Sequence, residues 1–257
     1  SRIPIVRGAV NLVLTMIEGV KILMHSAELI GEEEDYQPSK FEKWISEKLH
    51  IKIMDVVAFV AVVLALALFI GLFILLPTFI AGFLPKGMNT YLRSLVEGLM
   101  RIIIFIGYLM AVSCMKDIKR TFMYHGAEHK CINCIEHGLE LNVENVRKSS
   151  KQHKRCGTSF LFFVMIVSII FCFFITAESQ AARILIRIAL FPFIAGVSYE
   201  IIRLAGNSDN VFVNLLSRPG MWVQNMTTKE PDDSMIEVGI RAVEEVFDWR
   251  AWQKENL

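Results

Sequence analysis

The sequence predicts an all-α fold, a polytopic membrane helical bundle with about four spans, on three observations. Of the 257 residues, 54% are hydrophobic and only 21% are charged, whereas soluble chains average roughly 45–50% apolar and about 25% charged residues. Two uncharged runs, Val56–Leu76 and Gly157–Ala177, each have the roughly 20 residues that cross a hydrocarbon core. Two weaker apolar stretches accompany them. The composition therefore excludes a soluble enzyme, a disordered chain and a disulfide scaffold.

The N-terminal part, residues 1–53, is expected to contain an amphipathic helix over Ile3–Ile30. Asn11, Glu18 and His25 recur every seven residues among apolar neighbours and form one polar stripe. Such a helix can lie at the membrane interface with its polar side in water. In the alternative interpretation, one of these polar side chains points into a polar site. A solvated acidic turn, Glu32–Asp35, is predicted to follow.

Residues 54–204 are predicted to form the four-span membrane domain. Between the two clean runs, Ile102–Met115 is uncharged and is extended backwards by apolar residues among charged ones. The fourth span, about Ala181–Leu204, has an uncharged centre of only 12 residues, Ile188–Tyr199. Its flanking charges must therefore lie near the interfaces or face the protein. Pro192 lies mid-span, which a membrane helix tolerates when neighbours satisfy the freed carbonyl.

The distribution of lysine and arginine predicts the orientation. Residues 1–55 hold seven of them, residues 116–156 hold nine and residues 203–257 hold six. The positive-inside bias then places both termini and the middle loop, 116–156, in the cytosol. We expect a multi-pass protein of the cell membrane that contacts the lipid bilayer. No basic tract would follow a phosphate backbone, so nucleic acid is not expected as a partner.

The C-terminal part, residues 205–257, is predicted to be cytosolic and helical. Short helical stretches are expected to break at Arg218–Gly220. A final helix follows, with Pro231 in its first turn and aspartates at its positive end. Its apolar residues recur at helical spacing, which indicates a packing helix; they are Ile236, Ile240, Val243 and Phe247.

The candidate functional residues gather between residues 125 and 156, which include four of the six histidines and three of the five cysteines. On a helix, His125 and His129 lie one turn apart on one face, so both imidazoles can reach one ion. Glu128 neighbours them and can act as a base, which gives the H-x-x-E-H order of the inverted zinc-peptidase motif. If the helix continues, Glu136 returns to nearly the same angle. It would complete two histidines and one carboxylate with one open position, as in catalytic zinc or non-haem iron sites.

A second cluster, from His153 to Cys156, stands directly before the third span. These two side chains have the spacing of adjacent ligands, and the intervening loop is long enough to fold them onto the two histidines. If Cys156 or His153 fills the fourth position, the site is closed and structural; if water fills it, the site is catalytic. The alternative to a metal is a polar network between helices. Cys131 and Cys134 have the spacing of a redox pair without its strand-loop-helix context, and we interpret them as bystander thiols.

Several stretches together form a recognisable pattern: Tyr124–Lys130, Glu136, His153, Arg155–Phe160, Pro4–Gly8, Ser26–Glu28, Tyr199–Glu200, Gln224–Asp233 and Glu237–Val238. This pattern resembles the signature of the YqhQ-like bacterial membrane proteins, a domain-of-unknown-function family described as predicted metal-dependent enzymes. The resemblance implies a multi-pass protein of the cytoplasmic membrane. It also implies metal dependence centred on His125, Glu128, His129, Glu136, His153 and Cys156.

One departure from the family pattern concerns the N-terminus. A glycine-rich segment with a Glu-Gly-Val-Met-Met stretch is associated with the family and does not precede Ser1. This leaves open a truncated chain with a further ligand in the missing segment.

Three functions are considered on these residues. The first is a membrane-embedded metal-dependent hydrolase, a peptidase or amidase, in which His125, His129 and Glu136 hold a divalent ion, expected to be zinc. Glu128 would act as the base, and Arg155 would stabilise an oxyanion. The second is a non-enzymatic scaffold or chaperone for other membrane proteins, in which the same cluster fastens the middle loop to the third span. A transporter is the weakest of the three, because no inverted repeat is evident.

Overall fold

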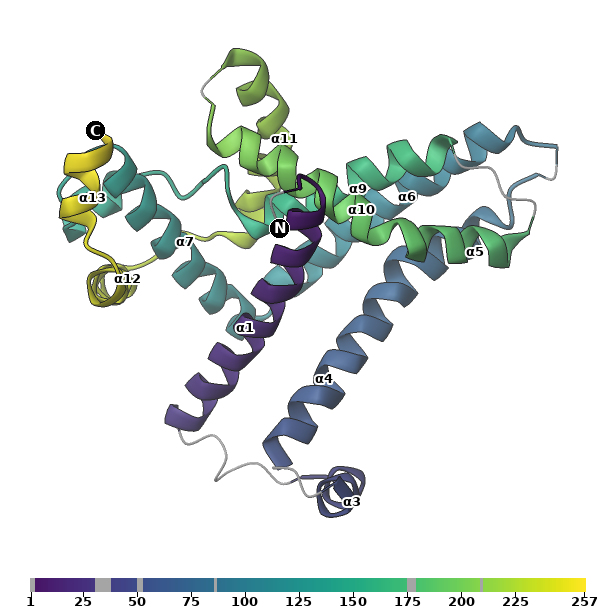
Figure 1. Cartoon of the computed structure of the whole chain (residues 1–257), viewed down its shortest axis with the longest axis horizontal. Helices are drawn as coiled ribbons and strands as arrows, with labels where there is room; N and C mark the ends of the chain where they lie inside the picture. The colour runs from purple at the N-terminus through teal and green to yellow at the C-terminus, as the bar shows by residue number, and fades with distance from the viewer. Residues whose placement is uncertain (1–2, 31–37, 50–52, 86, 175–178, 209) are drawn as a thin grey trace. The chain divides into compact units, whose positions relative to one another are not determined.

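Over the residues that the structure describes, the chain is built from helices, which confirms the predicted fold class. The structure is a computed structural model that describes residues 3–30, 38–49, 53–85, 87–174, 179–208 and 210–257; the predicted acidic turn at Glu32–Asp35 lies outside them. In chain order (Figure 1), the elements are α1 (Val6–Ile30), α3 (Lys40–Leu49), α4 (Ile53–Ile70), the π-helical turn η1 (Gly71–Leu75), α5 (Leu76–Ala81), α6 (Thr90–Ser113), α7 (Lys116–Glu136), α8 (Val143–Lys148), α9 (Gly157–Phe174), α10 (Gln180–Gly206), α11 (Val211–Thr227), α12 (Asp233–Val246) and α13 (Trp249–Asn256).

Internal contacts divide the chain into two units. Unit 1 contains residues 1–101 and 169–197, and unit 2 contains residues 102–168 and 198–257. In unit 1, α1 is the predicted N-terminal helix, and it packs against α4.

Four helical stretches are long and apolar enough to cross a membrane: Asp55–Ala81, Thr90–Ser113, Gly157–Phe174 and Ile184–Gly206. They correspond to the four predicted spans and indicate a membrane protein. The second stretch includes the predicted backward extension of the uncharged core at Ile102, and Glu97 and Arg101 of this extension are buried.

A buried ionic cluster joins three of the helices of unit 1. The carboxylate of Glu97 on α6 is fully buried and accepts hydrogen bonds from three side chains. Thr78 on α5 donates at 2.6 Å, Arg101 at 3.2 Å, and Arg187 on α10 donates from both terminal nitrogens, one of them at 3.0 Å. Both arginines are themselves buried. Charges inside an apolar helix bundle persist only when they are paired in this way. Of the charges that flank the fourth span, which were expected near the interfaces or facing the protein, Arg187 faces the protein.

In unit 2, helix α7 has α8, α12 and α13 packed against it (Figure 1). The residues of the buried core between these helices are Cys131, Cys134, Ile135, Leu141, Val146, Ile236 and Trp249. Of the apolar positions predicted for the last helix, Ile236 is completely buried in this core, and Ile240 and Val243 pack against it. This arrangement fixes one face of α7, and the histidine motif lies on another.

The predicted break at Arg218–Gly220 is wrong, because α11 runs through Pro219 without interruption. Proline removes one backbone hydrogen bond from a helix, and α11 continues past this loss. Next to the proline, α11 packs closely on α9, because a Cβ atom at Gly220 would lie only 3.0 Å from the hydroxyl of Ser159.

The last predicted helix is present with different ends. It begins at Asp233, after Pro231, and Asp232 caps it by accepting a hydrogen bond from the amide of Met235 at 3.0 Å. It ends at Val246, so Phe247 belongs to the connection to α13.

The substitution Glu97→Gln is expected to destabilise the protein by roughly 3–5 kcal/mol, because it leaves two buried guanidinium groups without their counter-charge. Thermal unfolding of the detergent-solubilised protein measures the effect. Glu237→Gln, at an exposed carboxylate on α12, is the control and should change stability by less than about 0.5 kcal/mol. Equal stability of the two variants would contradict the role assigned to the cluster.

Candidate metal centre

Helix α7 positions both histidines of the motif. It runs from Lys116 to Glu136, so the condition that the helix continue to Glu136 is met. His129 is buried and His125 half-buried, and their ring centroids lie 4.4 Å apart. The sequence therefore forms the local geometry that the His125–His129 spacing predicts.

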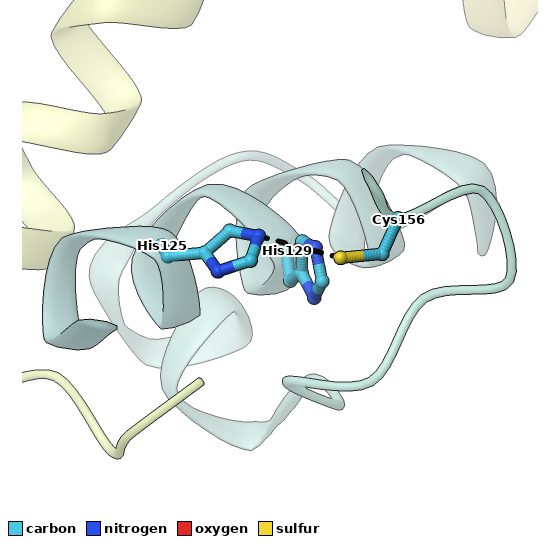
Figure 2. A group of neighbouring side chains, drawn as sticks. All are labelled: His125, His129 and Cys156. Atoms are coloured by element: carbon cyan, nitrogen blue, oxygen red, sulfur yellow. Dashed lines mark hydrogen bonds between the residues drawn. The ribbon is translucent and has the colours of Figure 1, made fainter. Parts of the chain in front are cut away.

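The thiol of Cys156 meets these two imidazoles, as Figure 2 shows. One ligand atom from each of His125, His129 and Cys156 can be chosen so that all three lie within 4.8 Å of one another. The Sγ of Cys156 lies 3.5 Å from Nε2 of His125. We call these three residues the His-His-Cys cluster.

Backbone carbonyls determine which nitrogen each ring presents to the cluster. Nδ1 of His125 lies 2.9 Å from the carbonyl oxygen of Thr227, and Nδ1 of His129 lies 2.7 Å from that of Lys151. A carbonyl oxygen only accepts, so Nδ1 must carry the proton in both rings. In the neutral imidazole the lone pair is then on Nε2 of each ring. Histidines that ligate metals are commonly oriented by this kind of hydrogen bond.

The separation of the His125 and Cys156 donors fits a tetrahedral ion. Nitrogen at about 2.0 Å and sulfur at about 2.3 Å from one tetrahedral centre lie about 3.5 Å apart, which is the separation of His125 Nε2 and Cys156 Sγ. Imidazole and thiolate donors suit zinc rather than magnesium or calcium, which prefer oxygen. The chemistry and spacing of the cluster are therefore compatible with a zinc ion.

The electrostatics favour an ionised thiol at Cys156. Burial opposes ionisation, but hydrogen bonds that the thiolate accepts from His125, from His129 and from the amide of Thr158 outweigh it and lower the pKa of Cys156 to about 5. In the same pair, the hydrogen bond to Cys156 raises the pKa of His125, against the effect of burial. A thiolate is the form of cysteine that binds metals.

The remaining predicted residues form a second group beside the cluster. Nε2 of His153 lies 3.1 Å from the carboxylate of Glu136, and the guanidinium of Arg155 lies 3.6 Å from the same carboxylate. The hydrogen bond to His153 lowers the pKa of Glu136 against the effect of burial, with the charges of His153 and Arg155 adding to the shift. The structure thus groups Cys156, and not Glu136, with the two histidines of α7.

Glu128 lies on the exposed side of α7. It lines a pocket of about 660 Å³ between α7 and α12. Glu136 and Arg155 of the second group also line this pocket, whereas the three residues of the His-His-Cys cluster do not. A volume of this size is typical of small-molecule sites.

Residues that the sequence did not single out hold the cluster in place. Lys130 donates to the carbonyls of Arg147 and Ser149, and Asn133 donates to those of Ser150 and Gln152. These bonds fix the segment 147–152 along α7 and so bring the carbonyl of Lys151 to His129. Because these hydrogen bonds end on backbone carbonyl oxygens, no pattern of side chains in the sequence predicts them.

Gln224 and Gly126 position the segments on the other side of the His-His-Cys cluster. The buried amide of Gln224 exchanges two hydrogen bonds, at 2.9 and 2.7 Å, with the backbone of His153. At Gly126, a Cβ atom would lie 2.0 Å from the carbonyl oxygen of Lys229. Only glycine at this position therefore allows the backbone at Lys229 to approach α7 so closely. Gln224 belongs to a stretch that carries the family resemblance, and this resemblance was the one feature of the sequence that pointed to a role for Gln224.

Cys131 and Cys134 lie in the core of unit 2, away from the cluster. Both thiols are fully buried and reduced. Burial raises the pKa of Cys131 to about 12 and also raises that of Cys134. They are therefore packing residues of the α7–α12 contact.

Comparison with known proteins identifies one family and one relative. The family model described as "Protein of unknown function (DUF1385)" matches residues 3–249. "Uncharacterized protein YqhQ" of Bacillus subtilis (strain 168) is 34% identical over 264 aligned positions, which cover the whole of this chain and 80% of the relative. No solved structure matches the chain.

A pH titration of thiolate absorbance should separate Cys156 from the core cysteines. In metal-free protein we expect one thiol to ionise with a midpoint near pH 5, and this step should disappear in Cys156→Ser. Cys131 remains protonated until about pH 12, so Cys131→Ser should retain the low-pH step. A first ionisation near the ordinary thiol value, about 8.5, would show that the histidines do not stabilise the thiolate.

Proposed function

The chain belongs to the DUF1385 family of proteins of unknown function, and from that premise we propose that it is a membrane protein with a zinc-dependent hydrolase site at the His-His-Cys cluster. One observation carries the proposal. Two backbone carbonyls hold both rings with Nε2 available, and Nε2 of His125 lies at a ligand spacing from the Cys156 thiol. A core packing cluster has no need of that orientation.

The neighbourhood of the cluster supports catalysis over a purely structural ion. Three protein ligands are typical of catalytic zinc sites, whereas structural sites use four, and within the described part of the chain the cluster has three. The pocket beside the second group is lined by two carboxylates and a guanidinium. Structural zinc sites do not require such a pocket.

The roles of the side chains follow from their positions. A bound zinc ion would supply Lewis acidity toward a carbonyl group. Glu128, exposed in the pocket, would accept the proton of the attacking water at its carboxylate. Arg155 would donate to the oxyanion that forms on the carbonyl oxygen; its guanidinium is held at the pocket by a 3.0 Å hydrogen bond to the carbonyl of Gly206. His153 would orient Glu136, which in turn holds the guanidinium in place.

The location of the site is part of the proposal. Cys156 directly precedes Gly157, the first residue of a helix of membrane-spanning length. The lysine and arginine distribution favours the cytosolic side of the cell membrane, with both termini on that side. The substrate would then approach at the boundary between lipid and cytosol.

A second candidate is a scaffold or chaperone for other membrane proteins, with the cluster in a structural role. The specific observation in its favour is that His129, Lys130 and Asn133 all clamp one connection, residues 147–152, to α7. An ion at the cluster would reinforce this clamp without any reaction.

Metal content tests the proposed ligands. Purified protein supplied with zinc should hold close to one ion per chain, and His129→Ala should lose it, because removal of one of three ligands destroys the site. His137→Ala is the matched control, since His137 is exposed just beyond the end of α7; this variant should retain zinc. Elemental analysis makes the measurement, and equal zinc content in the two variants would refute the site.

Glu128→Gln separates the two candidate functions. For the hydrolase, the variant should retain zinc and lose turnover on amide substrates by about 10²–10⁴-fold, the usual contribution of a general base. Hydrolysis of a peptide library, followed by mass spectrometry, measures turnover. Unchanged turnover would remove Glu128 from the mechanism, and intact client proteins that co-purify with both forms would favour the scaffold.

A further inference from the structure

Helix α11 has a buried face that is mostly small or polar and an exposed surface that is mostly apolar. The buried residues recur three or four positions apart, which places them on one face of the helix; they are Ser217, Gly220, Val223, Gln224 and Thr227. The large apolar side chains of the same helix are exposed; they are Val211, Phe212, Leu215, Leu216 and Trp222. This distribution is the reverse of that in a helix packed on a soluble core.

The exposed side of α11 is itself divided into an apolar and a polar part. Val211, Leu215 and Trp222 are spaced four and seven residues apart, so they lie along one line of the helix. They are 83%, 57% and 58% exposed. We call them the apolar stripe. Asn214, Arg218 and Asn225 have the same spacing and form a polar line next to the apolar stripe.

The buried face of α11 packs on the first turns of α9. A Cβ atom at Gly220 would lie 3.3 Å from the ring of Phe163, and the amide of Gln224 donates a hydrogen bond to the hydroxyl of Ser159 at 2.6 Å. Helix α9 is long and apolar enough to cross a membrane and begins at Gly157. Phe163 is therefore only about 9 Å along this helix from its first residue. These contacts, all within unit 2, place α11 beside the end of a candidate membrane span.

The chain also enters α11 directly from another span. Helix α10 ends at Gly206, and α11 begins at Val211. The two basic residues that precede Cys156 contact this connection: Lys154 donates to the carbonyl of Ser208 at 3.4 Å, and Arg155 donates to that of Gly206 at 3.0 Å. The start of α11 is thus held at the level where α9 begins and α10 ends. Basic side chains at the ends of spans commonly lie at the membrane interface.

We propose that α11 lies in the plane of the membrane, with its apolar stripe buried in the interfacial layer of the lipid bilayer. The helix has 17 residues, fewer than the roughly 20 that cross a hydrocarbon core. Interfacial helices bury an apolar face about 5–10 Å into the boundary between headgroups and acyl chains. Since the apolar stripe runs along most of α11, the whole stripe reaches this depth only when the helix axis is nearly parallel to the membrane.

Lipid is the occupant that the surroundings of α11 favour. The apolar stripe continues the apolar surface of two helices of membrane-spanning length, one that α11 contacts and one that it follows. Tryptophan is enriched at the membrane interface, which suits Trp222. Arg218 on the polar line can reach lipid phosphates, which a guanidinium binds well. The sequence alone predicted a cytosolic segment over residues 205–257, and the proposal places the α11 part of it in the bilayer surface.

This position would bring the lipid surface within one helix of the His-His-Cys cluster. Thr227, the last residue of α11, supplies the carbonyl oxygen that lies 2.9 Å from Nδ1 of His125. Gln224 holds the backbone of His153 from the same face. Residues that orient the cluster and residues that would contact lipid therefore belong to one helix. The proposal requires neither a metal nor hydrolase activity, so its outcome is independent of the proposed function.

Tryptophan fluorescence of the full-length protein in phosphatidylcholine vesicles tests the contact. Lipids with brominated acyl chains quench tryptophans that touch the chains, and iodide quenches tryptophans that face water. The signal lost in Trp222→Phe isolates Trp222. Brominated lipid should quench about half or more of that signal, most strongly when the bromines lie near the headgroup end of the chains, as expected at interfacial depth. Iodide should leave it nearly unchanged. Trp252→Phe is the control, because Trp252 packs against the buried core of unit 2, and the signal lost in this variant should not respond to brominated lipid.

Two relocated tryptophans test which side of α11 meets the lipid. In the Trp222→Phe background, Leu215→Trp restores a ring to the apolar stripe, and Asn225→Trp places one on the polar line; both positions are exposed. Leu215→Trp should regain quenching by brominated lipid, and Asn225→Trp should respond more strongly to iodide. Quenching of Trp222 by iodide, equal responses of the two relocated tryptophans, or a Trp222 that neither agent quenches would overturn the proposal. The last result would mean that protein, such as a second copy of this chain, covers the stripe.

Discussion

Two hydrogen bonds, from the imidazoles of His125 and His129 to the carbonyl oxygens of Thr227 and Lys151, govern the organisation of unit 2. The two oxygens come from segments far apart in the sequence, and each is delivered by separate contacts. Lys130 and Asn133 draw one segment onto α7. The absence of a side chain at Gly126 admits the other. These oxygens set the orientation of both rings and so the direction of the lone pairs on Nε2.

Three of the four cysteines of unit 2 show how the same side chain acquires opposite properties from its surroundings. All of Cys131, Cys134 and Cys156 are buried, and burial alone disfavours a thiolate. For Cys131 burial dominates, and its pKa rises to about 12. For Cys156 the two histidines reverse the effect, and its pKa falls to about 5. The neighbours of each thiol, rather than its depth, separate a packing residue from a candidate ligand.

Periodicity and spacing predicted the parts of this protein that depend on near neighbours in sequence. The four spans follow from the lengths of the apolar runs, and the one-turn separation of His125 and His129 follows from the helical repeat. The pairing of Glu97 with Arg187 could not be predicted in this way, because Arg187 lies on a helix distant in sequence and only the packed structure brings the two side chains together. The grouping of Cys156, rather than Glu136, with the two histidines was open for a related reason. Both residues lie within reach of the two histidines. The backbone hydrogen bonds that decide between them leave no pattern of side chains in the sequence.

The peptide bond between Cys156 and Gly157 joins the His-His-Cys cluster to the first residue of α9. A ligand bound to the Cys156 sulfur would therefore act directly on the end of a helix long enough to cross a membrane, because no flexible linker separates the two. A ligand that favours one position of the sulfur would therefore favour one position of this helix end.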